Sequence, residues 1–187
     1  MRKILFIIIF IFTNSANAEI IKEIEIIGNK RISNETVKVY GDIKLNKDYS
    51  KSQLNEISKN IYETNFFENV ELSLTSGLLK IILKEYQVIN GITLEGEKTT
   101  KLKEAILERL ILQENASFIK SQLADDIQTI KKVYGTFGFN FVSVDAKIEQ
   151  FSSNRVNLVF DIDKGEKSKI SNINFIGNKK VRERRLR

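Results

Sequence analysis

The pattern of apolar and polar positions predicts a repeating unit that begins with a strand. Isoleucine dominates residues 20–27, and the run ends at Gly28, which is typical of a strand that leads into a turn. A short helix is expected over residues 33–40, where the Ser33 side chain can accept a free backbone N–H as an N-cap. The unit therefore starts with a strand and a helix.

A second helix is expected over residues 50–64. Its apolar positions recur at intervals of three and four residues, as on one face of an amphipathic helix, and they are Leu54, Ile57 and Ile61. Ser50 and Gln53 have the spacing of a capping box, in which each side chain accepts from the backbone N–H of the other. The sequence thus marks the start of this helix as well as its buried face.

Two strands complete the unit. Apolar and polar residues alternate in the first strand, which comprises Val70, Glu71, Leu72, Ser73 and Leu74. The sequence Thr-Ser-Gly ending at Gly77 supplies a turn, and residues 78–83 form the returning strand. We therefore predict a unit of the order β-α-α-β-β.

The same order is expected again further along the chain. Its elements are a strand over 89–94, helices over 101–112 and 123–134, and a hairpin of residues 141–148 and 156–162. In each unit a three-stranded sheet would have one face covered by two helices, which is an α+β fold. The chain is expected to carry these units in tandem.

Short phrases that recur in a fixed order support the repeat. The phrase "IEIIGNK" around Gly28 recurs as "ITLEGEK" around Gly96 and as "INFIGNK" around Gly177. "KSQL" occurs at the start of the second helix in both units (51–54 and 120–123), and "IYETNFF" (61–67) is matched by "VYGTFGF" (133–139). Self-similarity at a nearly fixed period is the signature of a repeat architecture.

These phrases also predict the domain boundaries. The first domain is expected over residues 19–86 and the second over 87–165, and residues 166–187 are expected to start a third domain that this sequence truncates. Glycine takes positive φ without steric cost and Asn tolerates turn geometry. The expected turn residues are Gly28, Asn29, Gly96, Gly138, Gly177 and Asn178.

The first 18 residues have the pattern of a cleaved secretory signal peptide. Two basic residues precede an uninterrupted apolar run over residues 4–12, and the sequence Ala-Asn-Ala ends at Ala18. An apolar helix of this length would span about 14 Å, which is short of the roughly 30 Å of the hydrocarbon core. Cleavage is expected between Ala18 and Glu19, and the chain is expected to be exported.

The net charge of +6 comes from the two ends of the chain. Residues 1–18 hold two basic residues and residues 178–187 hold six, whereas the rest carries 22 Lys and Arg against 23 Asp and Glu. A nucleic-acid-binding protein needs its basic surface on the folded body. We therefore expect no nucleic-acid partner, and we interpret the basic end as the charged face of a helix in the third unit.

The composition argues against an enzyme. The chain has no His and no Cys, so the commonest general base, the thiol nucleophile and the soft metal ligands are missing. Asp125 and Asp126 are expected on the solvated face of a helix. Neither a catalytic residue nor a cofactor or metal ion is expected. The aromatic residues expected to pack mainly in the cores are Phe66, Phe67, Phe137, Phe139 and Phe141.

The ordered phrases resemble the POTRA domain, the polypeptide-transport-associated module. The resemblance rests on the Ile-x-Ile/Phe-x-Gly-Asn phrase of the first strand and on a second helix that ends in Tyr-x-x-x-Gly-Phe. It rests also on the link 164–166, which leads directly to the next such phrase. The first unit departs from the pattern, because Asn65 stands where the family often has glycine. Tandem POTRA domains directly after a signal peptide are similar to the outer-membrane protein assembly factors of Gram-negative bacteria, and this sequence would be an amino-terminal fragment of one.

The resemblance implies a scaffold on the periplasmic face of the outer membrane. The family's carboxy-terminal β-barrel, which holds it in that membrane, would lie outside this sequence. The implied partners are unfolded outer-membrane proteins, a periplasmic chaperone and the lipoproteins of the assembly machine. Such a domain can bind an extended peptide as an extra strand at an exposed sheet edge.

The second strand of each unit is the edge that the resemblance implies. In the first unit this edge comprises residues 70–74. In the second unit it comprises Phe141, Val142, Ser143, Val144, Asp145, Ala146, Lys147 and Ile148. Proline at Glu71 or Ser143 is expected to weaken capture without unfolding the domain.

Three alternatives remain open from the sequence. One is another member of the same superfamily, such as a translocation-assembly subunit or a two-partner secretion transporter. A division protein of the FtsQ type would carry one POTRA domain and an uncleaved transmembrane helix, which this sequence does not predict. The third is a secreted enzyme, against which the missing catalytic residue types argue.

Overall fold

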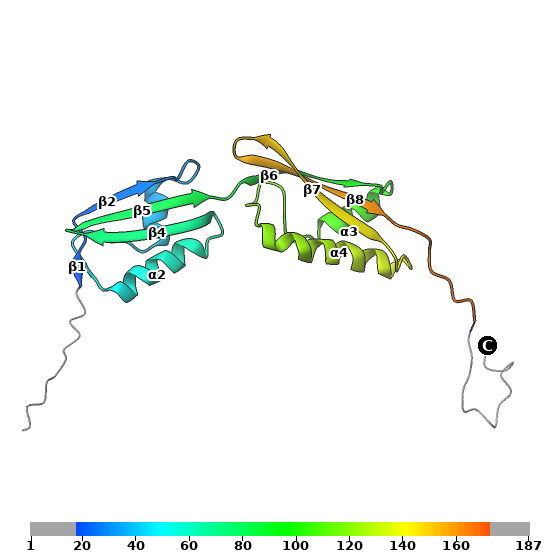
Figure 1. The fold of residues 1–187 in the computed structure, drawn as a ribbon, viewed down its shortest axis with the longest axis horizontal. Coiled ribbons are helices and arrows are strands. Elements are labelled where there is room, and N and C mark those ends of the chain that lie inside the picture. The colour runs from blue at the N-terminus through cyan, green and yellow to red at the C-terminus, as the bar shows by residue number, and fades with distance from the viewer. Residues whose placement is uncertain (1–17, 173–187) are drawn as a thin grey trace, which may run out of the picture. The chain divides into compact units, whose positions relative to one another are not determined.

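The computed structural model describes residues 18–172 in two compact units, one that ends at Glu85 and one that begins at Tyr86 (Figure 1). The expected signal sequence up to residue 17 lies outside the described residues. So do residues 173–187, which hold most of the expected third domain together with the expected turn residues Gly177 and Asn178.

Unit 1 is a three-stranded sheet with two helices (Figure 1). Its elements are β1 (Glu19–Ile20), β2 (Glu23–Ile27), α1 (Asn34–Tyr40), β3 (Asp48–Tyr49), α2 (Lys51–Tyr62), β4 (Phe67–Thr75) and β5 (Leu78–Glu85). The sheet order is β2-β5-β4, with β2 parallel and β4 antiparallel to the middle strand. The expected first strand is interrupted at Ile21, whose fully buried side chain joins the core.

Unit 2 repeats this arrangement. Its elements are β6 (Val88–Glu95), α3 (Thr100–Leu107), the 3₁₀ turn η1 (Lys120–Gln122), α4 (Leu123–Thr136), β7 (Ser143–Ser152) and β8 (Arg155–Asp163). The sheet order is β6-β8-β7, again with the first strand parallel to the middle strand. The predicted α+β architecture of β-α-α-β-β units is confirmed.

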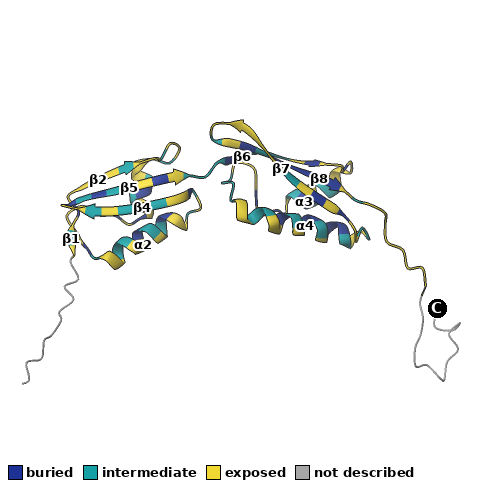
Figure 2. Ribbon diagram, viewed as in Figure 1, coloured by how far each residue is buried: buried dark blue, intermediate teal, exposed yellow. Residues whose placement is uncertain are grey.

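Each unit has its own apolar core between sheet and helices. In unit 1 the core includes Ile57 and Ile61 of α2 and Leu79 and Ile81 of β5. Partly buried and exposed residues alternate along β4, so only one face of this strand meets the core (Figure 2). Burial of one sheet face against helices supplies the main driving force for folding in a unit of this size.

The predicted helix starts of unit 1 are confirmed. Ser33 accepts a hydrogen bond from the backbone N–H of Thr36. Ser50 and Gln53 form the full capping box, because each side chain accepts from the backbone N–H of the other residue.

The first helix of unit 2 is shorter than predicted, since it ends at Leu107 and not at Leu112. The chain leaves the helix so that Leu110 and Leu112 can enter the core. The Gln113 side chain then donates to the carbonyl oxygens of Leu107 and Leu110, at and just beyond the end of the helix.

The hairpins also differ from the prediction in detail. Ser76 and Gly77 both have positive φ, +54° and +85°, which is the type I′ turn that matches the twist of paired strands. In unit 2 the strand β7 begins two residues later than expected and continues to Ser152, which pairs with Arg155. The hairpin loop is therefore shorter than predicted, since the expected strands ended at residue 148 and resumed at residue 156.

Gly28 and Gly96 occupy equivalent turns with φ of +94° and +79°. A Cβ atom at Gly28 would lie 1.9 Å from the carbonyl oxygen of Leu83, and one at Gly96 would lie 2.0 Å from that of Ile162. Any other residue would collide with the middle strand, so the first phrase of each unit needs glycine at this point.

Candidate functional site

Two long strands form open sheet edges. Within the described part of the chain, β4 pairs only with β5 and β7 pairs only with β8. An edge strand presents backbone N–H and C=O groups without ladder partners, and these can pair with another extended chain. The candidate site is therefore made of backbone groups along β4 and β7.

The turn geometry identifies the free groups of β4. A two-residue hairpin loop is flanked by a pair that exchanges both backbone hydrogen bonds, here Thr75 and Leu78. Hydrogen-bonded and non-bonded pairs alternate from there, so the backbone groups of Val70, Leu72 and Leu74 point away from β5. The Ser58 side chain of α2 donates to the Val70 carbonyl over 3.5 Å, which agrees with this orientation.

The contact between Gly96 and Ile162 identifies the free backbone groups of β7. The Ile162 carbonyl oxygen points toward β6, because it lies against Gly96. Asp161 and Asp163 on either side therefore face β7, where they pair with Asp145 and Ser143. The outward backbone groups of β7 belong to the alternate residues Val144, Ala146 and Ile148.

This orientation corrects the predicted effect of proline. The N–H groups of Glu71 and Ser143 point toward the middle strand of their sheets. Proline at either position would remove a ladder hydrogen bond and weaken the domain itself. Leu72 and Ala146 are the positions where proline removes an outward N–H.

The outer side of the first strand is closed at its beginning in both units. In unit 1, Ile21 donates to the carbonyl of Lys47 and accepts from the N–H of Asn46, over 3.2 and 2.7 Å. In unit 2, Ile89 donates to the carbonyl of Ala116 over 2.9 Å and accepts from the N–H of Asn115 over 2.8 Å. The segment between the two helices thus covers this edge, whereas no segment of the described chain pairs with the outer side of β4 or β7.

Side chains on the two edge strands alternate between core and solvent. Val70, Leu72 and Leu74 pack against the core of unit 1, and the intervening Glu71 and Ser73 are exposed. Val144 is buried in unit 2, but Ile148 further along β7 is 42% exposed. An added strand would therefore meet an apolar face and a polar face, as it would inside a sheet.

Not every expected edge or core residue takes its predicted place. Phe141 and Val142 precede β7, where Val142 is buried and Phe141 is 83% exposed. Phe137 is also exposed, so the prediction of core packing is wrong for these two phenylalanines. Phe67 is fully buried, and Phe66 and Phe139 pack against their cores as predicted.

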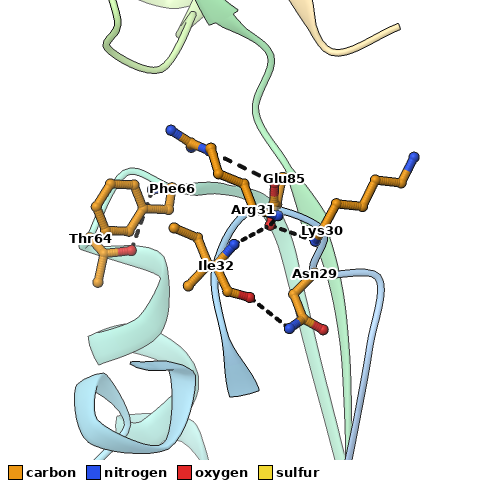
Figure 3. A network of polar contacts seen from close by, with 7 residues as sticks. All are labelled: Asn29, Lys30, Arg31, Ile32, Thr64, Phe66 and Glu85. Atoms are coloured by element: carbon orange, nitrogen blue, oxygen red, sulfur yellow. Dashed lines mark hydrogen bonds and ion pairs between the residues drawn. The ribbon is translucent and has the colours of Figure 1, made fainter. Parts of the chain in front are cut away.

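A carboxylate organises the turn beyond Gly28 (Figure 3). Glu85 ends β5, and its Oε1 accepts from the backbone N–H groups of Lys30, Arg31 and Ile32 over 2.8, 2.9 and 3.0 Å. The Arg31 guanidinium also lies 5.6 Å from the ring centroid of Phe66. Three convergent N–H groups make a local anion-binding turn, which the protein fills with its own side chain.

Unit 2 holds the same turn with a different carboxylate. Glu97, which follows Gly96, accepts from the backbone of Lys98 and Thr99 and from the Tyr134 hydroxyl at 2.6 Å. Lys164 adds an ion pair at 3.3 Å. Burial alone would favour the neutral acid, but these hydrogen bonds outweigh it and lower the pKa of Glu97 from 4.5 to about 2.

Asp126 corrects another expectation. Its side chain is fully buried, not solvated, and it accepts from the backbone N–H groups of Ile111 and Leu112 over 2.7 and 3.0 Å. In the predicted helix these two N–H groups would have donated to backbone carbonyls. In the structure they donate to the Asp126 carboxylate instead. Asp125 beside it is exposed, because adjacent residues of a helix point in different directions and only Asp126 points toward the core.

Two kinds of feature are absent from residues 18–172. No group of three or more His, Cys, Asp or Glu side chains there could hold a metal ion. None of the helices in that range has the length and apolar character needed to cross a membrane.

The chain is similar to known proteins over most of its length. The family model POTRA, "Surface antigen variable number repeat", matches residues 87–165. The outer membrane protein assembly factor BamA of Neorickettsia risticii (strain Illinois) is 27% identical over 170 residues, which cover 91% of this chain and 23% of that protein. The BamA of Neisseria meningitidis serogroup B (strain ATCC BAA-335 / MC58) is 28% identical over 169 residues, 89% of this chain and 21% of that protein.

A solved structure shares the fold. The N-terminal domain of Omp85 from the thermophilic cyanobacterium Thermosynechococcus elongatus superposes with a TM-score of 0.51 at 18% identity, over 77% of this chain and 63% of that one. The chain spans under a quarter of the length of the two BamA proteins. The resemblance seen in the sequence is confirmed: unit 2 matches the POTRA family model over residues 87–165, unit 1 repeats the same sheet topology, and the chain is similar to BamA proteins over about nine-tenths of its length.

Proposed function

We propose that this chain is the periplasmic binding scaffold of a machine that assembles outer-membrane β-barrel proteins. Its clients would be unfolded outer-membrane proteins, and a chaperone and lipoprotein subunits would be its partners. The proposal rests on the similarity to the outer membrane protein assembly factor BamA.

The observation that carries the mechanism is the pair of open edges. The outward N–H and C=O groups of Leu72 and Leu74 in β4, and of Val144, Ala146 and Ile148 in β7, offer a backbone template. Backbone pairing reads little side-chain sequence, so one edge can receive many different clients. An unfolded barrel strand has the alternating side chains that such an edge accommodates.

The test is a binding titration of the chain with a fluorescent peptide of about ten alternating apolar and polar residues, the length of a transmembrane β-strand. Leu72→Pro and Ala146→Pro combined remove one outward N–H from each edge and should weaken binding about tenfold, since each lost hydrogen bond contributes about 1 kcal/mol and the ring also blocks approach.

The matched control combines Leu72→Ala with Ala146→Ser. These changes alter the same side chains but keep both backbone N–H groups, so affinity should change by less than about twofold. Circular dichroism must show that both doubly substituted chains are folded. Equal affinity for the proline and control chains would refute capture at the edges.

A further inference from the structure

A groove between α3 and α4 on the helical side of unit 2 is not explained by edge capture. It has a volume of about 360 Å³ and is lined by Ala105, Arg109, Thr129, Lys132, Val133, Thr136 and Phe137. Ligand sites in proteins commonly start at about this volume. The groove lies outside both the sheet edge and the Glu97 turn.

The groove combines apolar walls with two unpaired cations. Ala105, Val133 and Phe137 supply apolar surface, and the Phe137 ring is 51% exposed. Arg109 and Lys132 belong to none of the ion pairs in the described part of the chain. One Arg109 nitrogen, Nη1, donates to the Ala105 carbonyl, which leaves further guanidinium N–H groups for a ligand.

No acidic residue lines this groove. A half-exposed aromatic ring beside two cations is a surface that fits an apolar segment carrying carboxylates. The lining residues of α4 run from Thr129 to Thr136, two turns or about 10 Å of helix. An amphipathic helix presents apolar side chains over the same distance at positions i, i+3 or i+4, and i+7.

The corresponding place in unit 1 has a different character. The repeated phrases align Gly41 with Arg109 and Asn60 with Lys132, and both unit 1 residues line a cleft of only about 110 Å³. The carboxylates of Asp42 and Glu56 also line that cleft. The basic, apolar groove is therefore a property of the second repeat and not of the fold.

We propose that the groove between α3 and α4 binds an acidic amphipathic helix of a partner protein. Its apolar side chains pack between the two helices, and its carboxylates pair with Arg109 and Lys132. This interaction is independent of strand capture, because it uses the other layer of the domain. A partner could thus stay bound while the β7 edge receives a client.

The probe is a labelled helical peptide of about eighteen residues, long enough to fold as an isolated helix, with leucines on one face and glutamates beside them. Fluorescence anisotropy with the whole chain should show saturable binding that weakens with added salt. Amide shifts in NMR spectra should map to the groove. A peptide with lysine in place of every glutamate should bind at least about tenfold more weakly.

Substitutions then locate the site. Arg109→Glu with Lys132→Glu should weaken binding at least about tenfold, and Phe137→Ala should weaken it severalfold because the apolar contact is lost. Lys120→Glu is the control for Lys132→Glu alone, because it makes the same charge change at an exposed position outside the groove, and it should have little effect. The edge substitutions Leu72→Pro and Ala146→Pro should leave this binding intact, which separates it from capture at the edges.

The proposal would be overturned if the glutamate peptide showed no saturable binding below about 1 mM, or if the lysine peptide bound as tightly as the glutamate peptide. It would also be overturned if Lys120→Glu weakened binding as much as Lys132→Glu, or if the amide shifts were confined to β7. Each of these can be read independently of whether the edges bind strands.

Discussion

The carbonyl oxygen of Leu83 closes the space beside Gly28, so that a Cβ atom there would lie only 1.9 Å away. Ile162 closes the space beside Gly96 in the same way. The contact explains why the same glycine phrase begins each unit. It also shows that the backbone groups of Leu83 face the first strand and not β4. The backbone groups of Val70, which is opposite Leu83 on β4, therefore have no ladder partner on β5.

Alanine at Gly28 or Gly96 should therefore destabilise the unit that carries it by about 3 kcal/mol, from backbone strain at positive φ and collision with the middle strand. Gly91→Ala in β6 is the matched control, because its nearest atom would lie 3.7 Å away at ordinary contact distance. Urea unfolding monitored by circular dichroism gives the comparison. If Gly96→Ala were as stable as Gly91→Ala, the proposed collision would be excluded.

The stability of unit 2 should fall as the pH drops from 4.5 toward 2. Because the pKa of Glu97 is lowered in the folded state, its contribution is complete above the unfolded value of 4.5 and is lost as the pH falls through about 2. At neutral pH this contribution is on the order of 3 kcal/mol. Glu97→Gln should remove that acid dependence.

Tyr134→Phe tests the same acid dependence by removing one hydrogen bond to Glu97 while keeping the carboxylate. It removes the hydroxyl that donates to Glu97 at 2.6 Å, so the pKa of Glu97 should rise and acid unfolding should begin at a higher pH. Unfolding at a series of pH values measures both effects. An unchanged acid transition in both chains would show that Glu97 does not carry it.

Asp126→Ala should destabilise unit 2 by about 2–4 kcal/mol, since the backbone N–H groups of Ile111 and Leu112 would be left buried without an acceptor. Asp125→Ala removes an exposed neighbour of the same chemistry and should change the free energy of unfolding by less than about 0.5 kcal/mol. Similar losses in the two variants would contradict the assigned role of Asp126.

Export should produce a chain that begins at Glu19. The Glu19 side chain accepts from the backbone N–H of Gly77 at 2.6 Å and its residue pairs with Tyr49, so the mature terminus would be held in unit 1. Intact mass measurement of the protein recovered from the periplasm of an expressing bacterium gives the cleavage site directly. A mass that retains residues 1–18 would refute the predicted signal peptide.

Periodicity and local capping chemistry were sufficient to predict the order of the elements. The Ser50–Gln53 box and the alternation over residues 70–74 depend only on near neighbours in sequence. The buried role of Asp126 and the contact of Glu97 with Tyr134 were beyond this reasoning, because these carboxylates and the groups that they contact lie 14 or more residues apart and only the folded chain brings them together. The groove at Arg109 and Lys132 could not be predicted either, because its lining comes from two separate segments of the chain, at α3 and at α4.

The orientation of the edge strands also needed the structure. A strand pattern identifies which side chains face the core, but it leaves open which N–H groups face the neighbouring strand. That assignment required the Ser76-Gly77 turn and the Gly96–Ile162 contact. Proline at Leu72 or Ala146, and not at Glu71 or Ser143, therefore tests whether the outward N–H groups bind a client.

The most direct test of strand capture is amide hydrogen exchange, followed by NMR with and without the alternating peptide. Without peptide, the N–H groups of Leu72 and Ala146 should exchange faster than those of Glu71 and Asp145, which pair with the middle strands. Addition of the peptide should slow exchange selectively at Leu72, Leu74, Val144, Ala146 and Ile148. Peptide binding that leaves the exchange of all these amides unchanged would contradict capture at the sheet edges.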